Sequence, residues 1–247
     1  VPAPPKMVVY NGIICDLHPL NLILDPKLDG TPHLNLLLPV LQPSSMSGGP
    51  NTALQLALRM ALAGVRIRFI STDTTPSGES ALYQHLINLV GPQAASLNVR
   101  FFDGHHLGSG TKVGKNDLFL ATAWWTVQKL KPHLGQFSDP RFFYLIQDFE
   151  PGLYNWSSSY ALALESYALP HIPVVNSSQL KNFLLAEQPG MFRTENFRSQ
   201  VLYFEPAIDP DLFFFEKTNR PRKNKILFYA RPTSAQRNLF EIGLKAL

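Results

Sequence analysis

Cysteine and charge are both scarce in this sequence of 247 residues. The single cysteine, Cys15, excludes a disulfide framework within the chain and indicates a reducing compartment. Charged residues make up 16% of the sequence, below the roughly 25% that soluble domains usually carry. No apolar run approaches the roughly 18 residues that a membrane-spanning helix needs, so the sequence predicts no such helix.

Basic residues are dispersed, and the net charge is only +4. The one dense basic run, residues 217–225, has no aromatic residues interleaved with its lysines and arginines. We interpret this run as a solvated linker and predict no nucleic-acid partner. Apolar residues make up 45% of the chain, which is enough for a large core.

The stretch 34–72 predicts a strand, a glycine-containing loop, a helix and a second strand. Its apolar run at 34–40 has the length of a buried parallel strand. Gly48 and Gly49 precede Pro50, which suits a first helical position, so we expect the helix to begin at Pro50 or the next residue. This geometry directs backbone N–H groups and the positive end of the helix dipole at the loop, where a phosphate would bind. The alternative is that the glycines only permit a tight turn, since the loop lacks G-x-G-x-x-G and the P-loop lysine.

The helix of this unit is apolar at nearly every position up to Leu62, which predicts that it is covered on most sides. Gly64 is expected to end it, because glycine adopts the left-handed conformation without a Cβ penalty. In the strand predicted at 65–69, Arg66 and Arg68 alternate with apolar residues.

Strands and helices continue to alternate along the chain, which predicts an α/β fold with a parallel sheet and helices on both faces. Residues 1–33 are expected to form an arm lying on the domain, and residues 104–114 a flexible loop. The remaining elements are expected as strands at 98–102, 117–121, 141–146, 172–175 and 200–204, and helices at 80–90, 160–167 and 177–186.

Three loops with polar or small residues, at 44–50, 122–126 and 147–152, each follow a predicted strand. Ligands of parallel sheets bind beyond the carboxyl ends of the strands, so we expect these loops to share one rim. No metal site is predicted, because His105 and His106 have no third ligand at a suitable spacing.

Several segments in order resemble the WsaF-type rhamnosyltransferases, which belong to glycosyltransferase family 4 and have a GT-B fold. These segments are SGGPNTALQLA, LATAWWTVQ, YLIQDFEPGLY, YALALESY, VVNSSQL and FYARP…RNLFEIGLKAL. The resemblance covers the chain from about residue 34 to its end. It implies two Rossmann-like domains facing a cleft, with the nucleotide-sugar held mainly by the C-terminal domain.

This resemblance implies a domain organisation for the chain. Its parts are an arm at 1–33, a Rossmann-like acceptor-side domain at 34–208, an interdomain linker at 209–224 and a truncated start of the nucleotide-sugar-binding domain at 225–247. Asp209 matches an aspartate of the family's interdomain connector, so the pair Asp209 and Asp211 is not expected to bind a metal. The helical pattern continues to the last residue, and we expect the chain to be part of a longer protein and inactive alone.

By resemblance, the donor diphosphate would be bound by Gly48 and Gly49 on one wall and by Arg231 and Arg237 on the other. Negative charge builds on the leaving phosphate during glycosyl transfer, and fixed N–H dipoles and cations stabilise it there. No cofactor is expected, because the nucleotide-sugar is a co-substrate and the GT-B fold does not need a metal.

The acceptor wall is expected to include Trp124, Trp125, Asp148 and Glu150. Neighbouring helical residues point about 100° apart, so at most one of the two tryptophans should face the cleft and the other should be core. The two carboxylates could hydrogen-bond acceptor hydroxyls, and they are the candidates for a catalytic base. The alternative is that they cap the following turn.

The function that the resemblance implies is a retaining, metal-independent transfer of a sugar, such as rhamnose from dTDP-rhamnose, in cell-surface polysaccharide biosynthesis. Its partners would be the nucleotide-sugar donor and a glycan or lipid-linked glycan acceptor. A cytoplasmic location is expected, with peripheral contact to the inner face of the membrane left open. The alternatives are a non-transferase relative, such as a nucleotide-sugar epimerase, and a carbohydrate-binding remnant without turnover.

Overall fold

A computed structural model describes residues 17–205, 226–228 and 239–247 of the protein. The linker expected at 209–224 and the two arginines expected at the donor, Arg231 and Arg237, lie outside the described residues, as does Asp209. The helix predicted to end the chain is present as α8 (Phe240–Ala246).

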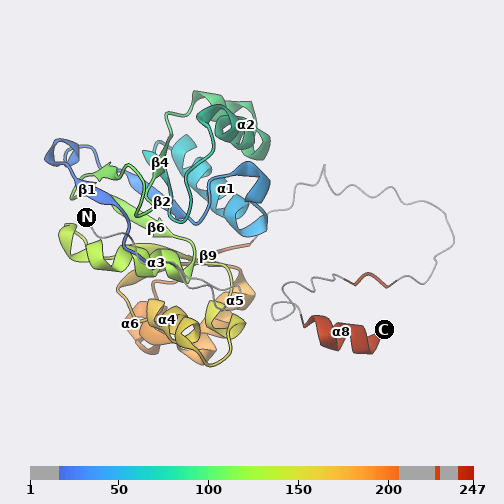
Figure 1. The fold of residues 1–247 in the computed structure, drawn as a ribbon. Coiled ribbons are helices and arrows are strands. Elements are labelled where there is room, and N and C mark those ends of the chain that lie inside the picture. Colours follow the sequence, from blue (N-terminus) through green and yellow to red (C-terminus); the bar gives the residue numbers. More distant parts are fainter. Residues whose placement is uncertain (1–16, 206–225, 229–238) are drawn as a thin grey trace, which may run out of the picture.

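Seven parallel strands form one sheet in the spatial order β4-β3-β2-β6-β7-β8-β9, which confirms the predicted α/β fold (Figure 1). Every strand predicted between residues 34 and 204 is present, with ends that differ from the prediction by at most two residues. A strand was also expected at 225–230, but residues 226–228, the described part of this range, form no strand. Their bounds are β2 Leu34–Leu38, β3 Ile67–Ser71, β4 Arg100–Asp103, β6 Leu118–Ala121, β7 Phe142–Ile146, β8 His171–Asn176 and β9 Leu202–Phe204.

Helices lie on both faces of this sheet, and each face has its own apolar core (Figure 1). One core joins the sheet to α1 (Gly48–Leu62) and α2 (Glu79–Val90). The other joins it to α3 (Trp124–Leu130), α5 (Ser178–Glu187) and α6 (Glu195–Arg198), and α4 (Ser158–Ser166) packs against α3. No helix in the described ranges is both long and apolar enough to cross a membrane.

Helix α1 begins at Gly48, two residues earlier than predicted. It ends as predicted at Gly64, whose φ is +93°. The N–H of Gly64 donates to the Ala61 carbonyl and that of Val65 to the Met60 carbonyl, which is the Schellman pattern. The prediction that this helix is covered on most sides was wrong: its buried residues follow helical spacing along one face, and they are Ala53, Leu54, Ala57 and Leu58.

Strand β3 is buried along its whole length, although its sequence places an arginine between apolar residues. Arg68 is only 5% exposed. Its Nη1 donates to Asp117 Oδ2 at 2.9 Å, and Asn35 Nδ2 donates to the same oxygen at 3.1 Å. A buried carboxylate therefore neutralises the arginine, which allows a charged residue on a covered face.

The N-terminal arm and the loop predicted at 104–114 contain two strands that the sequence did not reveal. β1 (Leu22–Leu24) pairs in parallel with β5 (Thr111–Val113) to form a separate two-stranded sheet. Three-residue strands carry too little periodicity to be recognised, so the prediction of a flexible loop was wrong. Within the described part of the arm, Leu20 belongs to the core of the domain.

His171, at the start of β8, is 4% exposed and packed among aromatic rings. Burial lowers the pKa of His171 from 6.5 to about 4, outweighing the hydrogen bond of Nδ1 to the Leu169 carbonyl at 2.8 Å. Between these two pH values the unfolded chain binds a proton that the folded chain does not. Stability should therefore be complete above pH 6.5 and fall by on the order of 3 kcal/mol as the pH approaches 4.

Urea denaturation between pH 7 and pH 4.5 measures this loss. The His171→Asn variant keeps an N–H donor for the Leu169 carbonyl but does not titrate, so its stability should depend less on pH than that of the wild type. Equal pH dependence in the two proteins would show that other groups cause the acid destabilisation.

Candidate functional site

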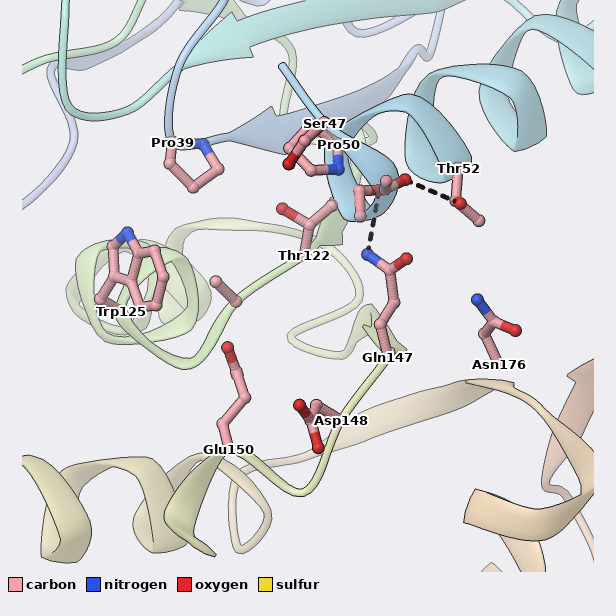
Figure 2. A pocket seen from close by; sticks show the side chains of 13 residues that line it. Pro39, Ser47, Pro50, Thr52, Thr122, Trp125, Gln147, Asp148, Glu150 and Asn176 are labelled. Carbon is pink, nitrogen blue, oxygen red and sulfur yellow. Dashed lines mark hydrogen bonds between the residues drawn. The ribbon is translucent and has the colours of Figure 1, made fainter. Parts of the chain in front are cut away.

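A cavity of about 690 Å³ opens at the carboxyl ends of the central strands (Figure 2). Its lining residues follow β2, β6 and β7, end β8 or lie in the first turns of α1 and α3, so the three loops expected at one rim are confirmed to meet there. The lining residues are Pro39, Ser47, Gly48, Gly49, Pro50, Thr52, Thr122, Ala123, Trp125, Gln147, Asp148, Glu150 and Asn176.

The cavity lies at the point where the strand order reverses. From β2 the chain proceeds through β3 to β4 on one side, and β6 then lies on the other side of β2. The loops after β2 and β6 therefore leave the sheet toward opposite faces and leave a crevice between them. This switch point is where open parallel sheets bind their ligands.

The N-terminus of α1 forms one wall of the cavity and has no side-chain cap. Asn51 donates the first bond of the helix, to the Ser47 carbonyl at 3.0 Å, and the Ser47 side chain makes no capping bond. The N–H groups of Gly48 and Gly49 meet no acceptor among the described residues. Two backbone donors and the positive end of the helix dipole therefore face the cavity.

Gln147 links the wall formed by the N-terminus of α1 to the wall formed by the loop after β7. Its Nε2 donates to the Gly49 carbonyl at 3.2 Å, which connects the end of β7 to the first turn of α1 (Figure 2). Thr122, at the end of β6, donates through Oγ1 to the Leu37 carbonyl at 2.8 Å. Gln147 and Asn176 were not predicted as site residues, and the available signal was that each stands directly after a predicted strand.

Glu150 lies between the cavity and the start of α3. Its Oε2 accepts from the Trp124 backbone N–H at 2.7 Å and from the Tyr144 hydroxyl at 3.2 Å. Burial, followed by the charge of Glu150, raises the pKa of Tyr144 well above its ordinary value, so this hydroxyl stays protonated and donates. Glu150 thus caps a helix, as the alternative interpretation allowed, but the helix is α3, which precedes it in the sequence.

The two adjacent tryptophans have different environments, as predicted from helical geometry. Trp124 is 0% exposed, and its Nε1 donates to the Tyr154 hydroxyl at 2.9 Å. Trp124 is therefore a core residue, and its side chain does not line the cavity where contacts with the acceptor were expected. Trp125 lines the cavity, and its Nε1 donates to Asp73 Oδ2 at 3.0 Å.

Asp73 and Lys129 form an ion pair behind Trp125 that the sequence analysis missed. Lys129 is 1% exposed, and its Nζ lies 2.8 Å from Asp73 Oδ1 and 2.9 Å from the Thr72 carbonyl. Asp73 therefore holds the indole of Trp125 with one oxygen and a buried ammonium with the other. The available signal was a lysine in a helix whose other residues are uncharged, and this signal does not reveal the partner of the lysine.

The cavity wall is polar and carries negative charge. Asp148 and Glu150 line it, whereas no lysine, arginine or histidine does so within the described part of the chain.

His18 and His106 stack with ring centroids 4.3 Å apart, and His105 lies next to them. Over the ranges that the structure describes, however, no three histidine, cysteine or acidic residues are placed to hold a metal ion.

These features define a Rossmann-like domain with a polar ligand site at the switch point of its sheet. The chain belongs to the family described as WsaF, N-terminal domain, because the model of that family matches residues 33–178. The resemblance inferred from the sequence motifs is thereby confirmed.

The chain is also similar to the O-antigen biosynthesis protein RfbC of Myxococcus xanthus, at 33% identity over 134 residues. The match covers 53% of this chain but only 9% of RfbC, so the chain corresponds to a small part of that relative.

Proposed function

We propose that this chain is the acceptor-side domain of a glycosyltransferase that acts in polysaccharide biosynthesis. The family match and the name of the O-antigen relative support this class of activity. The polar cavity at the switch point supports a site for a hydroxyl-rich ligand on this domain.

The observation that carries the proposal is the backbone conformation of the two glycines at the start of α1 and the free space beside them. Neither Gly48 nor Gly49 has a positive φ, and a Cβ at Gly48 would meet nothing within 4 Å. A Cβ at Gly49 would lie in ordinary contact with Gln147 Nε2, at 3.5 Å. The turn therefore does not require glycine, and the absence of side chains instead lets a ligand reach the backbone N–H groups.

When a sugar is transferred from a nucleoside-diphosphate sugar, the negative charge that develops on the departing phosphate must be stabilised. The N-terminus of α1 supplies partial positive charge, but the described lining of the cavity supplies no cation and includes two carboxylates. A diphosphate bound at this edge therefore needs positive charge from elsewhere in the protein. Arg231 and Arg237 are the residues that we propose for this role.

The acceptor is proposed to lie between Trp125 and the carboxylates of Asp148 and Glu150 (Figure 2). An indole face packs against the C–H bonds of a sugar ring, while carboxylates accept hydrogen bonds from its hydroxyls. Glu150 Oε2 also accepts two bonds from the protein, and both carboxylates are proposed as candidates for a catalytic base.

The finer assignment follows from the resemblance to WsaF-type enzymes. We propose rhamnose as the transferred sugar, dTDP-rhamnose as the donor, and a retaining, metal-independent reaction of the family 4 type. The proposed acceptor is a glycan or lipid-linked glycan at the cytoplasmic face of the membrane.

The complete protein should transfer rhamnose from dTDP-rhamnose to such an acceptor, and EDTA should leave the rate nearly unchanged. Release of free epimerised nucleotide-sugar would instead indicate an epimerase. Glycan binding without any turnover would indicate a carbohydrate-binding remnant.

Trp125→Ala should raise the KM for the acceptor about threefold to tenfold, because it removes one aromatic surface from the site. The KM for the donor should change little. Trp156→Ala is the matched control, since Trp156 is 94% exposed and does not line the cavity. Equal effects of the two substitutions on the acceptor KM would contradict the proposed position of the acceptor.

A further inference from the structure

A second cavity, of about 790 Å³, lies at the opposite edge of the sheet. It is bounded by the amino-terminal ends of β3 and β4, the C-terminal end of α1 and the two-stranded β1–β5 sheet. The candidate functional site is at the carboxyl ends of the same strands, so the two cavities are separate and share no lining residue.

The second cavity contains a buried arginine with donors to spare. The side chain of Arg68 is 7% exposed, and its Nη1 donates to Asp117 Oδ2 at 2.9 Å and to the Lys112 carbonyl at 3.1 Å. Its other guanidinium nitrogens contact no acceptor within the described part of the chain. Because Arg68 lines the cavity, these donors are available to a ligand there.

Three further cations surround Arg68. Arg100 pairs with Arg68 in the register of β3 and β4 and so lies on the same face of the sheet, and Arg66 and Lys112 also line the cavity. Arg66 and Arg100 have no carboxylate partner among the residues that the structure describes. Two carboxylates, Asp25 on the lining and the buried Asp117, therefore face four cations.

His33 is at the edge of this group but adds no charge near neutral pH. Burial lowers the pKa of His33, and the charge of Arg68 lowers it further. The excess of positive charge in the cavity therefore comes from arginine and lysine side chains, which remain charged over the whole range in which the protein is stable.

We propose that this second cavity binds a small, soluble, phosphate-bearing ligand. Two guanidinium groups with free donors match the oxygens of a phosphate in a bidentate manner, which an isolated lysine cannot do. The depth of Arg68 in the cavity also favours a soluble ligand over the headgroups of a membrane surface. Arg68 lies under the β1–β5 sheet, where a phosphate in a planar lipid surface could not reach it.

Inorganic pyrophosphate is a suitable probe, titrated calorimetrically into the protein at low ionic strength. The wild type should bind it, and higher salt should weaken the binding because Arg66, Arg100 and Lys112 are exposed. Arg100→Gln should reduce the affinity about tenfold or more. The Arg66→Gln/Arg100→Gln double variant should reduce it further, and both variants should fold normally because the two side chains are exposed.

A control variant tests the location of the ligand. Arg193→Gln removes the same charge from an exposed position outside this cavity, and it should leave the affinity unchanged. Equal losses of affinity with Arg100→Gln and Arg193→Gln would overturn the proposal.

Vesicles of phosphatidylglycerol test the lipid alternative. Pyrophosphate should bind in solution whether or not vesicles are present. No binding of pyrophosphate by the wild type, or vesicle binding that pyrophosphate does not compete for, would also overturn the proposal.

Discussion

Replacing Gly49 by alanine should lower kcat/KM of the complete protein by a factor of about 10² to 10³ while its stability stays the same or rises. The added methyl group would separate a ligand from the backbone N–H groups at the start of α1. Removing one well-placed donor of this kind costs about that much in rate. Stability should not fall, because the substitution creates no steric overlap and alanine is favoured over glycine inside a helix.

Thermal denaturation and steady-state kinetics on the same preparation test both halves of this expectation. Gly64→Ala is the matched control, because Gly64 has a φ of +93° and ends the same helix far from the first cavity. It should lower Tm without lowering kcat. If Gly49→Ala lowered Tm and left kcat/KM intact, the glycines would serve the turn, and the proposed ligand contact would be wrong.

The second large effect is expected at Asp73. Asp73→Ala should lower the free energy of unfolding by about 3 kcal/mol, because it removes the carboxylate that lies 2.8 Å from the buried ammonium of Lys129. We expect the lower end of the range for a broken buried pair, since 31% of the Asp73 side chain is exposed and water can partly replace it. The same change removes the acceptor of the Trp125 indole and should raise the acceptor KM.

A double-mutant cycle with Lys129→Met separates the ion pair from other effects. Methionine fills a similar volume without charge, so the double variant should be more stable than Asp73→Ala alone. Urea denaturation gives the four free energies. Effects that add to within about 0.5 kcal/mol would show that Lys129 does not depend on Asp73.

The seven strands of the large sheet were predictable because buried parallel strands are short continuous apolar runs. Patterns of this kind depend only on local residues, and the position of the shared rim follows from them through the topology of parallel sheets. The division between Trp124 and Trp125 was predictable for the same reason, since helical geometry alone requires it.

Features that depend on pairing between distant residues could not be predicted. Arg68 looked like a surface residue because its counter-charge, Asp117, is 49 positions away in the sequence. Asp73 and Lys129 are 56 positions apart, and neither segment reveals the partner of its charged residue. A single sequence shows which side chains are charged, but it does not show which charges neutralise each other in the interior.

The parallel pairing of β1 with β5 has a consequence for the order in which the chain becomes ordered during synthesis. Leu22 faces Thr111, so the arm leaves the ribosome early but has no partner until almost ninety more residues have been made. Pairings between residues so far apart form slowly, because the intervening chain must first lose much of its freedom. The segment that is translated first in this domain is therefore among the last to be fixed, and the cavity around Arg68 is completed only at that moment.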